Sequence, residues 1–136
     1  MIHFGHNDAK NSQNYPDRVT VGGSGDETQE IESPVTHQKE TIHTYGWYLR
    51  QYVKDARARG ATPIICSSVP RNTWINGKIQ RGFDGYAQWA AEAAKSSGAL
   101  FIDANTLAAN RYDALGQGQS AKYFLTASTQ PKPAPG

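Results

Sequence analysis

Apolar side chains recur at helical spacing through residues 40–59 and predict an amphipathic helix there. Arg57 and Arg59 fall in the last turn, where positive charge suits the helix dipole, and Gly60 is expected to cap the end. The apolar stripe consists of Tyr45, Tyr48, Leu49, Tyr52, Val53 and Ala56.

Short apolar runs bounded by turn residues alternate with helical segments along the chain. Residues 1–4, 61–68 and 100–102 predict strands, and residues 85–97 and 106–115 predict two further helices. Strands that alternate with helices are typical of a parallel sheet with right-handed crossovers. The sequence therefore predicts an α/β fold.

The ends of the two later helices are predicted from capping residues. Asp84 is expected to cap the start of the first of them and Gly98 its end. Asp103 is expected to cap the helix that follows, and Gly116 is expected to stop it.

Two long polar segments, residues 9–35 and 69–83, are predicted to be loops that leave the carboxyl ends of strands. Ligands of parallel sheets bind beyond those ends, so the 5–8 turn and the 71–74 segment are expected to share one rim. Residues 1–126 are expected to form one domain, and residues 127–136, which are rich in proline, an extended tail.

Composition narrows the classes of protein that fit. The 136 residues suit one domain, and the net charge of +2 is scattered, which does not favour a nucleic-acid surface. No apolar stretch approaches the ~20 residues of a membrane span. A single cysteine, Cys66, excludes an intrachain disulfide and is expected to be a buried thiol. One group of acidic side chains is expected to lie in a solvated loop, and it consists of Asp26, Glu27, Glu30 and Glu32.

The segment Phe4-Gly5-His6-Asn7-Asp8 is the first that could take part in chemistry. An asparagine amide at a strand end is a fixed neutral donor that can stabilise an oxygen becoming negative during acyl transfer. The neighbouring glycine lets the backbone approach a ligand closely. A simple turn is the alternative that these residues alone leave open.

The same segment resembles the third conserved block of SGNH hydrolases, in the form found in rhamnogalacturonan acetylesterases. Downstream segments are similar to the helix, strand and loop that follow in those enzymes, at residues 44–52, 62–74 and 86–105. The resemblance implies a flavodoxin-like α/β/α sandwich, here partial, and ester hydrolysis on an acetylated polysaccharide or oligosaccharide. No cofactor is expected, and the composition predicts no nucleic-acid or membrane partner. The resemblance also implies an extracellular or periplasmic location for a full-length relative.

The resemblance assigns one catalytic role within the chain, the oxyanion donor, which falls on Asn7. The substrate-contacting residues are predicted to be Gly5, His6, Arg71, Asn72 and Trp74. Arginine can pair with the carboxylate of a galacturonate, and tryptophan offers a flat face to a sugar ring. The alternative for Trp74 and Arg71 is ordinary packing and a surface position.

The chain departs from the family at its two main catalytic blocks. It contains neither a Gly-Asp-Ser nor an Asp-x-x-His sequence, and its four histidines are His3, His6, His37 and His43. Serine hydrolysis needs a nucleophile and a base within hydrogen-bond reach. We therefore expect that this chain is a fragment of an esterase and is inactive on its own. Any signal peptide is expected upstream of Met1.

Three alternatives remain open from the sequence. The chain could be a non-catalytic carbohydrate-binding remnant of the same fold. A different nucleophile, Ser24 or Ser67, could act with His37 or His43. A metal site at His3, His6 and Asp8 is disfavoured, because His3 and His6 are expected on different faces of a strand and no further ligand converges.

Overall fold

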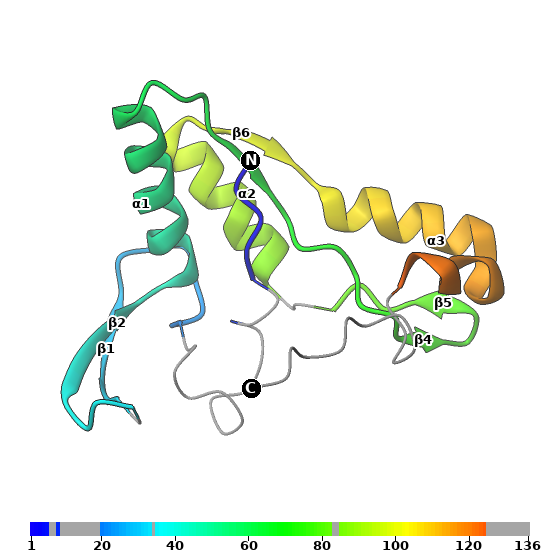
Figure 1. Ribbon diagram of the computed structural model, residues 1–136, viewed down its shortest axis with the longest axis horizontal. Coiled ribbons are helices and arrows are strands. Elements are labelled where there is room, and N and C mark those ends of the chain that lie inside the picture. Colours follow the sequence, from blue (N-terminus) through cyan, green and yellow to red (C-terminus); the bar gives the residue numbers. More distant parts are fainter. Residues whose placement is uncertain (6–7, 9–19, 34, 83–84, 125–136) are drawn as a thin grey trace, which may run out of the picture.

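The computed structural model describes residues 1–5, 8, 20–33, 35–82 and 85–124, and within them strands alternate with helices (Figure 1). The elements are β1 (Thr28–Glu32), β2 (Lys39–His43), α1 (Tyr45–Ala58), β3 (Ile64–Cys66), β4 (Trp74–Ile75), β5 (Lys78–Ile79), α2 (Tyr86–Ser97), β6 (Leu100–Ile102), α3 (Ala104–Ser120) and a 3-10 turn at Ala121–Tyr123.

A small parallel sheet lies at the centre of the fold. β3 pairs in parallel with β6, and Ile65 lies opposite Phe101. On the other side of β3, Ile2 forms a parallel bridge to Ile65, with its amide 2.7 Å from the carbonyl oxygen of Ile64. The mixed α/β prediction is therefore confirmed. The strand predicted at residues 1–4 is reduced to this isolated bridge at Ile2, which lies beside the interior strand β3.

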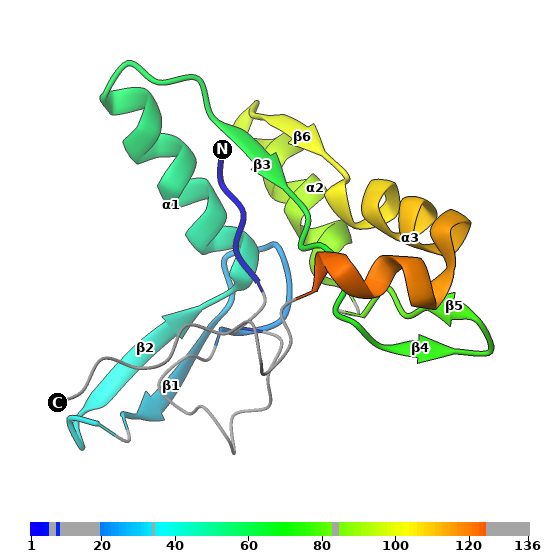
Figure 2. The same ribbon diagram turned by 45° about the vertical axis from the view of Figure 1, so that its right-hand side comes forward.

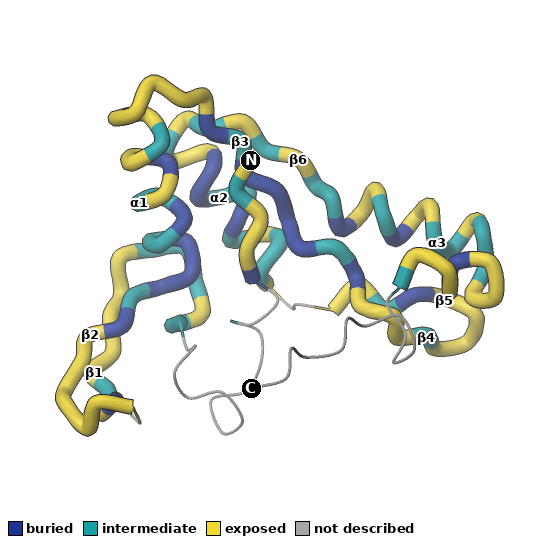
Figure 3. Tube along the Cα trace, viewed as in Figure 1, coloured by how far each residue is buried: buried dark blue, intermediate teal, exposed yellow. Residues whose placement is uncertain are grey.

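One face of this sheet is covered by α1 and α2. Leu49 and Val53 of α1 and Ala93 of α2 pack with Ile65 in a single core. Of the apolar stripe predicted for α1, Tyr45, Leu49 and Val53 enter this core, whereas Tyr52 is exposed. Figure 3 shows the buried positions gathered where α1, α2 and β3 meet. Burying such side chains contributes about 1.5–3 kcal/mol each. Cys66 is buried beside this core, as predicted.

The opposite face of the sheet is more open. Leu100 is 60% exposed and Ile102 is 39% exposed, and both alternate along β6 with Phe101, which packs against the core. The described residues therefore supply one helical layer on this sheet. α3 continues beyond β6 and runs away from α1 (Figure 1).

The predicted start of the first helix, at residue 40, is wrong. Residues 39–43 form β2, and α1 begins at Tyr45. Ile42 is buried and the three residues before it are exposed, and the ladder to β1 defines the strand. The side chain of Thr44 then caps the helix by accepting a hydrogen bond from the Trp47 amide, 3.0 Å away. At the other end Gly60 has φ +75°, as its predicted capping role requires.

The predicted loop of residues 9–35 contains a strand. Thr28–Glu32 forms β1 and pairs antiparallel with β2, so that the two make a hairpin projecting away from the helical layer (Figure 2). β1 is almost entirely exposed and polar, because its backbone ladder to β2 holds it rather than burial. Glu30 and Glu32 are therefore solvated, as predicted, but they lie on a strand.

The predicted loop of residues 69–83 also contains a hairpin. β4 and β5 pair antiparallel around Asn76 and Gly77, both of which have positive φ, 50° and 74°. Asn-Gly between two strands is a strong signal for a two-residue hairpin turn, and the sequence prediction overlooked it. The Ile79 amide donates to the carboxylate of Asp113 across 2.8 Å, which ties the hairpin to α3.

The third predicted helix, residues 106–115, is longer in the structure. α3 begins at Ala104 because Asp103 accepts from the Thr106 amide at 3.1 Å, which is the predicted cap. Gly116 does interrupt the helix, with φ 77° and ψ 162°, but a further turn follows it. None of the helices in the described ranges is long and apolar enough to cross a membrane.

The helix predicted at residues 85–97 is confirmed as α2, and Gly98 caps its end with φ 66°. Gly85 occupies the capping position at its start and provides no side-chain hydrogen bond. Asp84, predicted to be that cap, lies outside the described residues, as does the tail of residues 127–136. The domain boundary at residue 126 therefore stays a prediction.

Candidate functional site

The backbone that follows the Ile2 bridge makes a tight approach to its neighbours at Gly5. Gly5 is buried with φ +127°, a conformation that side chains rarely adopt. A β-carbon there would lie 2.7 Å from the Ser68 hydroxyl oxygen and 3.3 Å from that of Tyr45. Only glycine fits this position, because it must lie against both the end of β3 and the start of α1.

Two hydroxyl groups meet at the backbone just before this glycine. The Phe4 carbonyl oxygen accepts a hydrogen bond from the Tyr45 hydroxyl at 2.9 Å and another from the Ser68 hydroxyl at 2.8 Å. A carbonyl oxygen has two lone pairs, so both of its acceptor sites are occupied. The orientation of the peptide that enters Gly5 is thereby fixed from two elements.

A third hydroxyl binds the backbone at Asp8. The Tyr86 hydroxyl, at the start of α2, donates to the Asp8 carbonyl oxygen at 2.9 Å. The rings of Tyr45 and Tyr86 meet edge to face with centroids 4.9 Å apart. The carbonyl groups of Phe4 and Asp8 are thus held by neighbouring tyrosines of the two helices that cover the sheet.

The electrostatics keep these hydroxyl groups protonated. Burial raises the pKa of Tyr45, and the nearby negative charge of Asp8 raises it further. Burial and the same carboxylate also raise the pKa of Tyr86. Burial in turn raises the pKa of the Asp8 carboxyl group. Both tyrosines are therefore hydrogen-bond donors throughout the physiological range.

A second polar network lies at the ends of β3 and β6. The Ser67 hydroxyl donates to the Asp103 carboxylate at 2.8 Å and accepts from the backbone amide of Asn105 at 2.9 Å. Burial alone would raise the pKa of Asp103, but hydrogen bonds from Thr106 and Ser67 lower it overall. Ser67 is 0% exposed, so in this conformation it cannot reach a substrate as a nucleophile.

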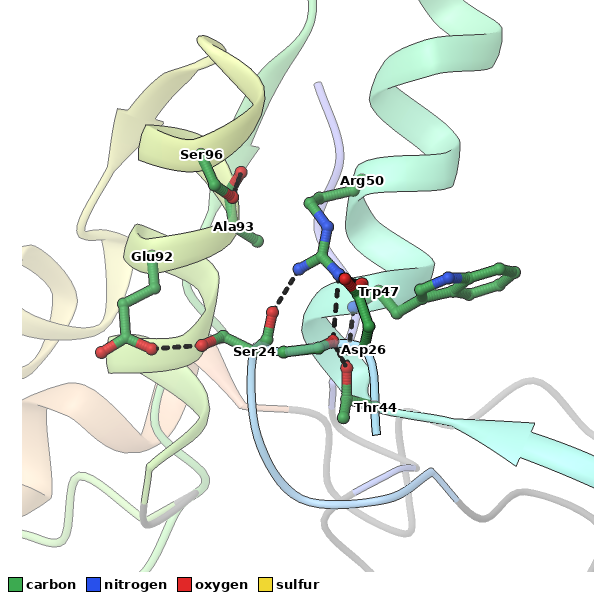
Figure 4. Close-up of polar contacts among 9 residues, drawn as sticks. Ser24, Asp26, Thr44, Trp47, Arg50, Glu92, Ala93 and Ser96 are labelled. Atoms are coloured by element: carbon green, nitrogen blue, oxygen red, sulfur yellow. Dashed lines mark hydrogen bonds and ion pairs between the residues drawn. The ribbon is translucent and has the colours of Figure 1, made fainter. Parts of the chain in front are cut away.

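The loop at Ser24 is fixed between the two helices. Figure 4 shows Arg50 of α1 and Glu92 of α2 approaching this loop from opposite sides. Arg50 donates to the Ser24 and Gly25 carbonyl oxygens and pairs with Asp26, while the Ser24 hydroxyl donates to Glu92. An open depression of about 490 Å³ lies over these residues and is lined by Ser24, Gly25, Asp26, Arg50, Glu92 and Ser96.

The histidines considered as partners for Ser24 contact other groups. His37 lies in the β1–β2 hairpin, 3.9 Å from the carboxylate of Glu32. His43 stacks on Trp47 with ring centroids 3.7 Å apart. Because the Ser24 hydroxyl is bonded to Glu92, the structure gives no support to a Ser24–His37 or Ser24–His43 pair.

The predicted sugar-contacting residues fall into two groups. The Asn72 side-chain oxygen accepts from the Trp74 indole at 2.9 Å, so these two side chains lie together at the start of β4. Arg71 is exposed beside them. The β4–β5 hairpin lies next to α3, whereas the N-terminal strand ends nearer α1 and α2 (Figures 1 and 2). The structure therefore groups Asn72 with Trp74 and places Gly5 with Tyr45 and Ser68.

Several sequence predictions could not be located. His6 and Asn7 lie outside the described residues. Within the described part of the chain, no cluster of three or more histidine, cysteine, aspartate or glutamate side chains is placed to hold a metal ion. The sequence prediction did not find the roles of Tyr45, Ser68 and Tyr86, since their backbone partners are 41, 64 and 78 positions away.

Comparison with known proteins indicates that this chain is distantly related to an esterase. No family model matches the chain. The chain is similar to the probable rhamnogalacturonan acetylesterase YesY of Bacillus subtilis (strain 168), with 27% identity over 125 residues. The match covers 92% of this chain and 48% of the relative, so the chain spans about half the length of that protein.

Proposed function

We propose that these residues form part of a carbohydrate esterase that removes acetyl groups from a rhamnogalacturonan or related pectic polysaccharide. The observation that carries this proposal is the similarity to an acetylesterase across 92% of the chain. It is supported by the position of Phe4 and Gly5, which closely follow Ile2, the residue that bridges to the interior strand β3. Ligands bind beyond the carboxyl ends of such strands.

The proposed chemistry is serine-dependent acyl transfer on an SGNH-type, flavodoxin-like sandwich. Asn7 would donate its amide to the oxygen that becomes negative in the tetrahedral intermediate. Neither a Gly-Asp-Ser nor an Asp-x-x-His sequence occurs in these 136 residues. The proposal therefore assigns the nucleophile and the base to the rest of the full-length polypeptide, meaning the product of the whole reading frame that contains this sequence.

The proposal places substrate contacts on both groups of rim residues. Gly5 and His6 would lie beside the reacting ester, and residues 1–126 would belong to the catalytic domain. Trp74 is held by Asn72 and is partly exposed, which suits stacking on a sugar ring. Arg71, exposed beside them, would pair with a galacturonate carboxylate.

The first test is the coding sequence on either side, combined with labelling of the expressed polypeptide. We expect a Gly-Asp-Ser sequence before residue 1 and an Asp-x-x-His sequence after residue 136. A fluorophosphonate should label the serine of the full-length polypeptide, and a serine-to-alanine variant should take up no label. The 136-residue chain alone should not be labelled. Flanking sequence that lacks both motifs would overturn the esterase proposal.

A second candidate function is carbohydrate binding without catalysis. The Asn72–Trp74 hydrogen bond favours it, because a tryptophan held in place is a preformed stacking surface. Titration calorimetry with pectic oligosaccharides separates the two candidates. Binding by a full-length polypeptide that takes up no fluorophosphonate would favour the second candidate, whereas labelling of its serine favours the first.

A further inference from the structure

Three hydroxyl groups donate to the backbone at Phe4 and Asp8, on either side of the segment that the sequence predicts to be a turn, and they come from separate elements. Tyr45 lies at the start of α1, Ser68 follows β3, and Tyr86 lies at the start of α2. We propose that the hydroxyl groups of Tyr45, Ser68 and Tyr86 form a hydroxyl clamp that positions this turn for catalysis. The inference rests on the proposed function, since it deepens the account of the same site.

The clamp acts on both ends of the turn. Tyr45 and Ser68 saturate the Phe4 carbonyl oxygen, at 2.9 and 2.8 Å. In a trans peptide the next amide hydrogen points opposite to the carbonyl, so fixing this oxygen also fixes the direction of the Gly5 amide. Tyr86 fixes the Asp8 carbonyl at 2.9 Å. The backbone that enters the turn and the backbone that leaves it are therefore both anchored.

The packing around Gly5 makes the clamp specific to this backbone path. A β-carbon at residue 5 would clash with the Ser68 hydroxyl oxygen at 2.7 Å, so the serine can reach the Phe4 carbonyl only past a glycine. Tyr45 is buried in the core and Ser68 is also buried, which restricts their movement. Oxyanion donors need such positioning, because a donor that must reorganise during the reaction loses much of its electrostatic benefit.

The clamp is a set of positioning residues, since each hydroxyl acts through the backbone of the turn rather than on the substrate. The matched variants are Tyr45→Phe, Ser68→Ala and Tyr86→Phe, each of which removes one hydroxyl oxygen. The control is Tyr52→Phe, which makes the same change on α1, where the ring stacks on Phe4 with centroids 5.0 Å apart. Each variant leaves its ring or β-carbon in place, so core packing changes little.

The first readout is amide hydrogen exchange in the full-length polypeptide, measured by mass spectrometry on a peptide that covers residues 5–8. Removing one clamp hydroxyl should speed exchange there by roughly 2- to 12-fold, the range that corresponds to one lost hydrogen bond. Exchange in α1 and β3 should change less than in the turn. Tyr52→Phe should leave exchange in the turn at the wild-type rate.

The second readout is kinetics of the full-length polypeptide. The clamp variants should lower kcat for acetate release and leave KM nearly unchanged, because the turn is needed in the transition state. Unchanged exchange in the turn would overturn the clamp, even if the polypeptide is an active esterase. Faster exchange in an inactive polypeptide would overturn the proposed function and leave the hydroxyl clamp as a structural device. Faster exchange with an unchanged kcat would overturn its catalytic role.

Discussion

Replacing Ile65 with alanine should destabilise the folded chain by about 2–5 kcal/mol. Ile65 is the residue of β3 that bridges to Ile2 on one side and lies opposite Phe101 on the other. It is 0% exposed and packs against both α1 and α2. Truncation would leave a cavity between the sheet and its helical layer. The loss would be a large part of the total, because the free energy of unfolding of a small domain is only about 5–15 kcal/mol. Urea unfolding followed by circular dichroism measures the loss.

The matched control is the same substitution at Ile75, which is 55% exposed on the β4–β5 hairpin. Ile75→Ala should change the free energy of unfolding by about 0.5 kcal/mol or less. Equal losses at the two positions would show that the core does not lie between β3 and the two helices. A loss below about 1 kcal/mol at Ile65 would contradict the fold in the same way.

Replacing Asn7 with alanine in the full-length polypeptide should lower kcat for acetate release by roughly 10²- to 10³-fold, with KM nearly unchanged. The oxyanion role proposed for Asn7 rests on the resemblance of its segment to the third block of SGNH hydrolases. A side-chain amide that donates to a developing oxyanion stabilises the transition state far more than the bound substrate, so its loss appears in kcat. Steady-state kinetics on an acetylated oligosaccharide measures both constants.

Asn76→Gly is a suitable control for Asn7→Ala. Asn76 is exposed in the β4–β5 turn with φ 50°, a conformation that glycine adopts without strain. This variant should keep wild-type kcat. An Asn7→Ala polypeptide with kcat within a few-fold of wild type would contradict the oxyanion role and leave the simple-turn interpretation of residues 5–8.

The predictions that succeeded were those in which burial follows a local period. The buried face of α1 at Tyr45, Leu49 and Val53 was visible because those residues are four apart. β3 and β6 were visible as short apolar runs between turn residues. In both cases the apolar side chains of the segment itself decide its structure, so the sequence around each residue contains the necessary information.

The sequence does not predict the β1–β2 hairpin, because β1 has almost no buried side chain. β1 reads Thr-Gln-Glu-Ile-Glu, a polar sequence whose strand structure comes from its ladder to β2. Residues 40–43 were assigned to the helix because they adjoin its apolar stripe, and only pairing with β1 shows that they are a strand. The β4–β5 turn is different, because its Asn76–Gly77 pair is a local signal from which a two-residue hairpin is predictable.

The candidate site was predictable only in part. The sequence pointed to the end of the first strand, and the structure shows a glycine there that has no room for a side chain. The hydroxyl clamp could not be predicted, because the contacts of Tyr45, Ser68 and Tyr86 depend on how two helices and a strand pack together. No local pattern in the sequence encodes such distant pairs.

Acetate release from acetylated rhamnogalacturonan tests the central claim most directly. The full-length polypeptide should release acetate, and both its serine-to-alanine variant and the 136-residue chain alone should release none above a heat-denatured control. No release by the full-length polypeptide, or release by the 136-residue chain alone, would contradict the assignment of these residues to one part of a serine-dependent carbohydrate esterase.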